Sequence, residues 1–377
     1  MAQRKLRVGL IGAGEVAQVV HLPALGLLSH LYEAYAITDI SAAAVQHCAQ
    51  KFRIPRTYPT ADALIADPDV DVVFILTSDE FHAEYTIAAL AANKHVMLEK
   101  PITLSLPSAQ RMLAAEEKSQ GRVFVGYMRR YAPSFTSTFL SEVATMPKIK
   151  HAFVRDIVGP NAHFVSQSGT SPEKFTDFPA TAGAERDTRL AALFQEAFPH
   201  NQEITDEKKL FCRFLGSLGS HDLSLMREAI GFPDSVAGVS CNEPFYSAIF
   251  NYTHPASGQK FSVTYETGID NVPRFDAQMS VFGEDKAVTI KYDTPYVKAL
   301  PIEVTVVEKD PETGGRIEKK VLASYEDAYT SELRHLYRAV VEGAEIKTNL
   351  QDAVYDLKIF DMLYRAAWPA ENWDGTD

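Results

Sequence analysis

The residues with the clearest chemical pattern lie near the N-terminus. The apolar run Leu6–Ile11 leads into Gly12–Ala17, a G-x-G-x-x-A turn between a strand and a helix. There the first glycine permits a tight bend, the second lets backbone N–H groups approach a pyrophosphate, and the alanine lets the helix pack on the strand. Asp39 ends the next apolar segment, at the distance where a carboxylate can accept ribose hydroxyls. This pattern predicts a dinucleotide site, although a βαβ turn that binds no phosphate would also contain such glycines.

Strands and helices alternate around this turn. The β-branched run 71–76 and the segments 95–98 and 123–126 have the composition of buried strands, and helices are expected between them. Pro23 should kink or restart the helix that begins at Glu15. The pattern is typical of a doubly wound parallel sheet, with a Rossmann domain over residues 1–128.

Beyond residue 128 the periodicity changes from helical alternation to period two. Alternating runs at 261–266, 277–282, 288–292 and 302–307 are separated by turn compositions. We expect an α+β domain over 129–377 with a large open, mostly antiparallel sheet, closed by two helices over 328–367. Its uncovered face should be buried in a homo-oligomer, a dimer or tetramer, with Phe261, Val263, Tyr265 and Val281 as candidates for the two faces.

The insertion at 164–211 has no clear strand pattern. It is rich in Ser, Thr, Pro and Glu, and only Arg189–Phe198 looks helical. Long loops of this kind are usually functional, so we expect a lid over the substrate, with Arg186 or Arg189 as contacts. An oligomer contact is the alternative.

Composition narrows the class of protein. The 377 residues carry a formal net charge of −12 and no Lys/Arg run, which argues against a nucleic-acid or anionic-membrane partner. The three cysteines are far apart and fit a reducing compartment, so a cytoplasmic location is expected. No metal-ligand spacing surrounds them.

Three further motifs carry a family resemblance. Glu99-Lys100-Pro101 follows a strand, Thr77-Ser78 to His82 opens a helix, and Gly126–Tyr131 follows the last parallel strand. Together with the glycine turn, they resemble the Gfo/Idh/MocA oxidoreductase family, closely over the first 131 residues and by architecture beyond. The resemblance implies that Lys100 lies at the active site and His82 near a nicotinamide.

The resemblance also implies that Gly219–Asp222 opens the helix of a catalytic histidine, His221. Here the chain departs from the family, because Ser217 and Ser224 stand where acidic residues are common. Chemically, a lysine can take the proton of a secondary alcohol if its pKa is lowered by burial or by a neighbouring cation. A helix start would favour neutral His221. Lys100 could instead be a solvated strand end, and His221-Asp222 a helix-capping pair.

These considerations give two sets of candidate site residues. Arg129 and Arg130 could face a ligand or form a surface pair, and polar residues on the first strand beyond could line the pocket or form a solvated face. The cofactor set is Gly12, Ala13, Gly14, Glu15, Val16, Asp39, Thr77, Ser78, His82, Glu99, Lys100 and Arg129. The substrate set is Lys100, Arg130, Tyr131, Arg155, Asn161, His163, Ser217 and His221.

The expected function is hydride transfer between NAD and a secondary alcohol of a sugar, cyclitol or sugar derivative. Asp39 should favour NAD over NADP, because a carboxylate repels a 2′-phosphate. Two alternatives remain: a redox-neutral elimination or bond cleavage that uses bound NAD transiently, and an NAD-binding regulator without catalysis. The resemblance also predicts a cis peptide bond between Lys100 and Pro101.

Overall fold

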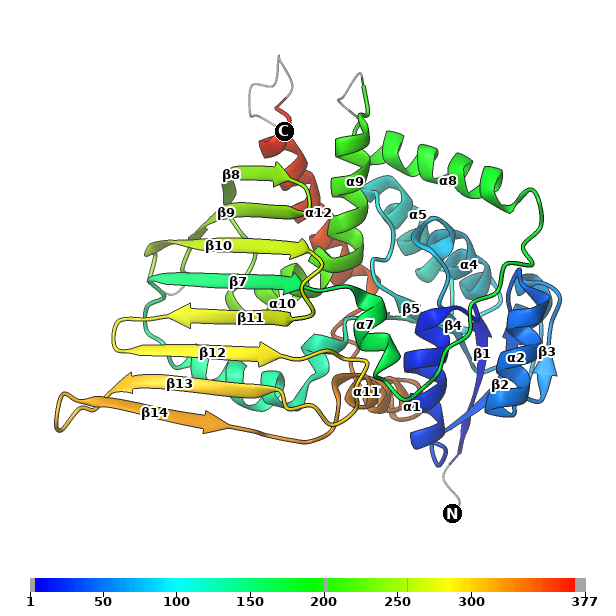
Figure 1. Cartoon of the computed structure of the whole chain (residues 1–377), viewed down its shortest axis with the longest axis horizontal. Coiled ribbons are helices and arrows are strands. Elements are labelled where there is room, and N and C mark those ends of the chain that lie inside the picture. The colour runs from blue at the N-terminus through cyan, green and yellow to red at the C-terminus, as the bar shows by residue number, and fades with distance from the viewer. Residues whose placement is uncertain (1–3, 200–202, 256, 370–377) are drawn as a thin grey trace. The chain divides into compact units, whose positions relative to one another are not determined.

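The computed structural model describes residues 4–199, 203–255 and 257–369, which form two compact units (Figure 1). The first unit contains residues up to Tyr127 together with Ser168–Pro199 and Glu332–Leu357. The second contains Met128–Gln167, the chain from residue 200 to Ser331, and the part from Lys358 onward. Each unit is therefore built from segments that are distant in sequence.

The first unit is built on a six-stranded parallel sheet. Its order, β3-β2-β1-β4-β5-β6, reverses direction between β1 and β4 and is that of a dinucleotide-binding fold. The parallel prediction is confirmed. The strands are β1 Leu6–Ile11, β2 Tyr32–Thr38, β3 Arg56–Thr57, β4 Val72–Ile75, β5 His95–Glu99 and β6 Val123–Gly126.

Two of the helices between these strands begin directly after a serine that caps them. Ser41 and Ser105 accept hydrogen bonds from backbone N–H groups of the helices that they cap, α2 and α5. The helix after the glycine turn does not restart at Pro23: it stays helical from Glu15 onward and passes through a π-helical segment, η1 Ala17–His21, into the helix that begins at Leu22. The helices are α1 Leu22–Leu27, α2 Ala42–Phe52, α3 Ala61–Ile65, α4 Asp79–Ala91 and α5 Leu106–Glu116.

Later parts of the chain complete the first unit. The helix α8 Ala182–Ala197 comes from the insertion, starts seven residues earlier than the expected patch at Arg189, and packs on α4 and α5. In α11 Ala328–Glu342, the Leu333 carbonyl accepts a hydrogen bond from the Tyr32 hydroxyl at 2.6 Å. The Thr348 carbonyl accepts one from Val125 N at 2.8 Å, just before α12 Leu350–Ala367.

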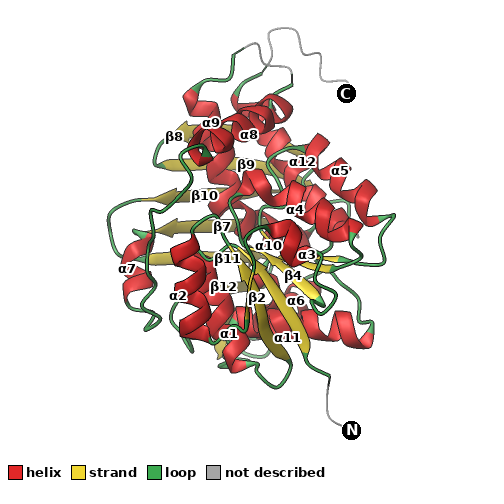
Figure 2. Ribbon diagram, turned by 90° about the vertical axis from the view of Figure 1, so that its right-hand side faces the viewer, coloured by secondary structure: helices red, strands yellow, loops and turns green. Residues whose placement is uncertain are grey.

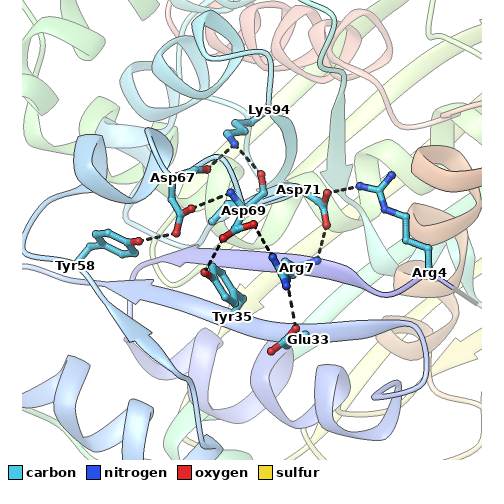
Figure 3. Close-up of polar contacts among 10 residues, drawn as sticks. Arg4, Arg7, Glu33, Tyr35, Tyr58, Asp67, Asp69, Asp71 and Lys94 are labelled. Atoms are coloured by element: carbon cyan, nitrogen blue, oxygen red, sulfur yellow. Dashed lines mark hydrogen bonds and ion pairs between the residues drawn. The ribbon is translucent and has the colours of Figure 1, made fainter.

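A polar network fixes the amino-terminal edge of the parallel sheet (Figure 3). The Arg7 backbone N–H of β1 donates to Asp71 at 2.8 Å, and its guanidinium donates to Asp69 at 2.7 Å. Lys94 donates to the carbonyls of Asp67 and Val70 at 2.7 and 2.8 Å. These bonds hold the loop before β4 against β1, at the edge opposite the glycine turn.

The second unit is built on an eight-stranded sheet of order β14-β13-β12-β11-β7-β10-β9-β8. Its pairs are antiparallel except for β7 with β10, so the expected large, mostly antiparallel sheet is confirmed. Figure 2 shows β8, β9, β10, β7, β11 and β12 in this order from top to bottom. The strands are β7 His151–Val158, β8 Ser235–Asn242, β9 Phe245–Thr253, β10 Lys260–Ile269, β11 Phe275–Phe282, β12 Lys286–Tyr292, β13 Glu303–Lys309 and β14 Arg316–Val321. Its helical segments are η2 Met128–Tyr131, η3 Ser134–Phe139, α6 Leu140–Ala144, α7 Asn161–Ser166, α9 Asp206–Phe214, η4 Leu215–Gly219 and α10 Ser220–Ile230.

One face of this sheet is covered by the chain itself. Phe261, Val263, Tyr265 and Val281 are all at most 7% exposed, so they belong to the covered face. Their assignment as candidates for both faces is therefore wrong, because period two places 261, 263 and 265 on the same side. Phe245 and Ile249, by contrast, are 40% and 47% exposed on the other face of β9.

Neither a membrane-spanning helix nor a cluster of metal-ligand side chains is found in the described part of the chain. None of the helices in residues 4–199, 203–255 and 257–369 combines the length and apolarity that a membrane span needs. Across the same residues, no three His, Cys, Asp or Glu side chains are grouped so that they could hold a metal ion.

Candidate functional site

The carboxyl edge of the parallel sheet gathers most of the predicted cofactor residues. The glycine turn follows β1, Asp39 follows β2, Thr77 and Ser78 follow β4, and Lys100 follows β5. Because these strands are parallel, their carboxyl ends lie at one edge. The order reverses between β1 and β4, and ligands of open α/β sheets bind in the crevice at such a point.

The geometry of the glycine turn fits a pyrophosphate. Gly12 has φ +110°, and a Cβ there would lie 2.7 Å from the Leu76 carbonyl oxygen, so a larger residue cannot be accommodated. Gly14 is exposed, and a Cβ there would meet nothing within 4 Å. The space beside Gly14 is therefore open to a ligand, and Glu15 and Val16 begin the helix next to it, partly exposed.

Asp39 lies directly beside this turn. Its Oδ2 accepts a hydrogen bond from Ala13 N at 2.7 Å, and its Oδ1 accepts one from Ser41 N at 2.8 Å. A carboxylate has about four lone-pair sites, so the partly exposed Asp39 can still accept from ribose hydroxyls. The residues present thus fit the adenosine side of a dinucleotide.

His82 joins the loops that follow β4 and β5. It is 1% exposed, with Nδ1 2.7 Å from the Pro101 carbonyl oxygen and Nε2 3.0 Å from the Thr77 carbonyl oxygen. Thr77 Oγ1 is buried and has no hydrogen-bond partner among the described residues, so a ligand can supply one. The exposed Ser78 donates to Glu80 at 2.7 Å.

Glu99 turns inward instead of towards the edge. Its Oε1 lies 2.7 Å from His21 Nε2, and its Oε2 accepts from the Lys100 backbone N–H at 3.3 Å. Burial raises the pKa of Glu99, but the hydrogen bond and charge of His21, with Lys100 and His82, outweigh burial and lower it. The Glu99 carboxylate therefore stabilises the backbone of Lys100 by accepting a hydrogen bond from its N–H group. The Lys100–Pro101 peptide bond is cis, as predicted.

His21 is a residue that the sequence analysis did not single out. It ends the π-helical segment η1, is fully buried, and packs its ring edge-on against Phe74. The only signal for it was the irregular helix before Pro23, since π-helical turns often occur at functional sites.

In the second unit, Arg129 forms a buried cluster with two carboxyl groups. Its Nη1 lies 2.9 Å from Asp156 Oδ2 and 2.5 Å from Asp222 Oδ1, and all three side chains are at most 3% exposed. Burial raises the pKa of Asp222 well above its usual range, and Asp156 raises it further, against the opposing effect of Arg129. Burial thus favours the form of Asp222 that carries a proton, next to the Arg129 guanidinium.

The same proton explains two other atoms of the cluster. Asp156 Oδ1 and Asp222 Oδ2 are buried oxygens without a hydrogen-bond donor among the described residues. A hydrogen on the Asp222 carboxyl provides a donor between the two groups. Arg129, expected at the cofactor, is buried and uses Nη1 for both carboxyl groups, and its carbonyl accepts from the Tyr292 hydroxyl at 3.1 Å.

The neighbouring candidates are also buried. Arg130 is 3% exposed and pairs with Glu228 of α10, and Tyr131 is 2% exposed. Arg129 and Arg130 therefore do not form a surface pair.

His221 does not lie at the start of a helix. Residues 206–230 are helical without interruption, because η4 connects α9 to α10 through π-helical turns. The predicted dipole effect on His221 is wrong, since that effect is confined to the first turn. The capping alternative is wrong too, because no side chain caps α10 and Asp222 pairs with Arg129. His221 is partly exposed; the exposed Ser217 donates to the Phe214 carbonyl at 3.2 Å.

The remaining substrate candidates of the second unit are partly or fully exposed. Arg155 pairs with Glu266 and Asp276 of neighbouring strands, on the face of β7 opposite the buried Asp156. Asn161 and His163 are exposed in α7, where His163 Nε2 lies 2.9 Å from Gln167 Nε2. These placements agree with a solvated face.

The part of the insertion that belongs to the first unit is held there by ion pairs. Arg186 donates to the buried Glu80 at 2.9 Å, and Arg189 pairs with Glu84 and Glu185. Glu196 accepts hydrogen bonds from Ser105 at 2.5 Å and from Arg111 at 3.2 Å. Both arginines that were considered as substrate contacts thus hold α8 on α4.

Comparisons with known proteins agree with this geometry. Residues 6–127 match the model of an oxidoreductase family with an NAD-binding Rossmann fold. Inositol 2-dehydrogenase of Acidothermus cellulolyticus is 37% identical over 134 residues, 35% of this chain and 39% of that enzyme's length. Myo-inositol 2-dehydrogenase of Thermotoga maritima is 23% identical over 346 residues, 90% of this chain and 89% of that protein.

A solved structure supports the fold of the whole chain. The 3-ketoreductase KijD10 of Actinomadura kijaniata, crystallised with NADP and TDP-benzene, superposes with a TM-score of 0.70 at 16% identity, covering 97% of this chain and 98% of that one. Over residues 6–127 the chain is thus similar to the NAD-binding Rossmann domain of the Gfo/Idh/MocA oxidoreductase family, and it spans less than two fifths of the length of the first inositol dehydrogenase named above.

Proposed function

We propose that this protein is an NAD-dependent dehydrogenase that acts on a secondary alcohol of a sugar, a cyclitol or a sugar derivative. The observation that supports it most is the arrangement of the glycine turn, Asp39, Thr77 and Lys100 along one edge of the parallel sheet, around the point where strand order reverses. Cofactor and proton acceptor would meet there.

Each part of the edge has a task in this proposal. The backbone beside Gly14 holds the pyrophosphate, and Asp39 accepts the ribose hydroxyls. Thr77 Oγ1, buried and without a partner among the described residues, can bond to the nicotinamide half. A bound nicotinamide supplies the acceptor for the hydride.

Lys100 is the proposed proton acceptor. Its amine would take the hydroxyl proton as the alcohol is oxidised and return it in the reverse reaction. The Glu99 carboxylate, anchored by His21, fixes the backbone N–H of Lys100 and thereby the start of its side chain. His221 would orient the substrate hydroxyl, and Ser217 contributes no charge.

The substrate class is suggested by two features. The relatives described above are named as inositol dehydrogenases, and a cyclitol carries the secondary hydroxyl that this chemistry requires. The net charge of −12 favours a neutral substrate over an anionic one. We also propose a cytoplasmic homo-oligomer.

The test is a panel of cyclitols, aldoses and sugar derivatives, each incubated with NAD and followed at the NADH absorbance band. NADH formation that is lost in Lys100→Ala, with NAD binding retained, supports the proposal. Product formed without net NADH would favour the redox-neutral reaction, and NAD binding without turnover on any compound would favour a regulator.

A further inference from the structure

The N-terminal end of α2 receives carboxylates from two distant parts of the chain. Asp39, at the end of β2, accepts from Ser41 N at 2.8 Å. Asp177, from the insertion, accepts from the Ser41 hydroxyl and from Ala43 N, the latter at 3.0 Å. Ser41 Oγ in turn accepts from Ala44 N at 3.0 Å. The N–H groups with which this helix end would bind an outside anion are thus already paired with protein oxygens.

The stretch before Asp177 is anchored along the same helix. Lys51 donates to the carbonyls of Thr170 and Ser171, both at 2.7 Å. Gln18 exchanges two hydrogen bonds with the Glu173 backbone, at 2.9 and 3.0 Å. The rings of His47 and Phe175 lie 5.4 Å apart. Asp177 is therefore held at the N-terminal end of α2 by contacts from α2 itself and from η1, the helical segment that follows the glycine turn.

We propose that Asp177 is a second determinant of cofactor choice, which occupies the anion position that the 2′-phosphate of NADP would need. This inference rests on the proposed function, that the edge binds a dinucleotide. The ribose 2′-hydroxyl is accepted by the carboxylate after β2, so a 2′-phosphate would have to lie next to Asp39, against the first turn of α2. That turn is where Asp177 sits.

The charges around this position oppose a phosphate. Hydrogen bonds from Ser41 and from Ala43 N lower the pKa of Asp177, so the carboxylate is ionised at neutral pH. A 2′-phosphate brings a further −1.5 to −2 charges beside two carboxylates. The residue after Asp39 is Ile40, 58% exposed, which offers no cation. NADP would thus have to displace a bound carboxylate, whereas NAD would not.

The experiment measures the dissociation constants of NAD and NADP by calorimetry for the full chain and three variants. Asp177→Ala removes the carboxylate. Asp177→Asn removes only the charge and leaves an oxygen for Ala43 N, so the insertion keeps its anchor. Asp187→Ala, at an exposed position of α8 in the same insertion, makes the same change in net charge and is the matched control. 2′,5′-ADP is a second probe, because it presents the phosphate without the nicotinamide half.

We expect both Asp177 variants to bind NADP and 2′,5′-ADP about tenfold more tightly than the wild type, with NAD affinity changed by less than about threefold. Asp187→Ala should keep the wild-type ratio. If the wild type prefers NAD and both Asp177 variants keep its NAD-to-NADP ratio, the role of Asp177 is refuted while the proposed function stands. If the wild type binds neither dinucleotide, the proposed function itself fails.

Discussion

Lys100 is the residue on which the proposed chemistry depends most directly. We expect Lys100→Ala and His221→Ala each to lower kcat by about 10²–10⁴-fold, the usual contribution of a general acid or base, with NAD affinity nearly unchanged. Ser217→Ala should cost far less, because that exposed hydroxyl donates to the Phe214 carbonyl. Steady-state kinetics with the best substrate of the panel and calorimetry with NAD provide both numbers.

The order of these effects is the informative outcome. A Ser217→Ala variant as slow as Lys100→Ala, or a Lys100→Ala variant with full turnover, would move proton transfer to another residue. Tyr131 and Asp222 are poorer substitutes, because both are at most 2% exposed.

The cluster around Arg129 makes a prediction about pH and stability. The pKa of Asp222 is raised in the folded chain, mainly by burial, so the folded state keeps a proton that the unfolded state releases above about pH 3.9. The stability contribution of this group is complete below that pH and declines as pH rises towards the folded pKa. Asp222→Asn mimics the protonated carboxyl, so its stability relative to wild type should improve as pH rises from 4 to 7. Thermal unfolding across that range measures the difference, and a difference that stays constant would contradict a protonated Asp222.

The partner carboxylate should behave in the opposite way. Asp156→Asn removes the charge that balances Arg129 in a site where all three groups are at most 3% exposed. Breaking a buried pair from one side costs about 3–5 kcal/mol. Denaturant unfolding at neutral pH should therefore rank Asp156→Asn well below both wild type and Asp222→Asn. Equal losses in the two variants would show that the proton is not localised on Asp222.

At the scale of elements, the packing of α8 on α4 depends on an ion pair between the two helices. The side chain of Glu80 is 1% exposed and pairs with Arg186 at 2.9 Å. Arg186→Gln leaves this carboxylate with the Ser78 hydroxyl but no cation, so we expect α8 to detach more often while the sheet stays folded. Hydrogen exchange should become faster over residues 182–197 but not over β1 or β4. Asp187→Ala is the control, and unchanged exchange in Arg186→Gln would show that Glu80 does not anchor α8.

Most strands and helices of the first unit could be predicted from the sequence, because local residue patterns determine each of them. The glycine turn and the β-branched run before Thr77 determine local conformation, and the structure confirms the strands that they predict. The continuous helix 206–230 was not readable. Gly216 and Gly219 look like a break, yet η4 carries the chain through them in helical geometry.

The candidate site was predictable only in part for a similar reason. A strand's end places Asp39 and Lys100 at one edge by topology alone. Contacts between segments that are distant in the sequence leave no periodic signal. The buried pairing of Arg129 with Asp156 and Asp222 therefore could not be derived from residue spacing, and neither could the hydrogen bonds of Asp177 at the N-terminal end of α2. Burial of a charged residue is equally hard to derive from sequence, and Arg129 and Arg130 are both 3% exposed although a surface pair was one of the two expectations.

At the scale of the whole molecule, the eight-stranded sheet has two different faces. One is buried by the chain, and the other alternates apolar residues such as Ile249 with Thr264 and Ser262, which are partly exposed. Charged residues on this face pair with one another, as Arg155 does with Glu266 and Asp276. A broad surface of β-branched and self-paired side chains is suited to a second copy of the same sheet.

We therefore expect the protein to be a dimer or tetramer that buries this face. A stable interface needs about 800 Å² from each partner, which several strands of such a sheet can supply. Ile249, 47% exposed on β9, lies on that face, so Ile249→Arg would place an unpaired charge in the contact and should shift the assembly towards monomer. Tyr325→Arg is the control, because Tyr325 is 75% exposed and lies outside the strands. Light scattering coupled to size exclusion at micromolar concentration gives the mass of each. A wild type that runs as a monomer would exclude the assembly, and an Ile249→Arg variant with wild-type mass would place the interface on another surface.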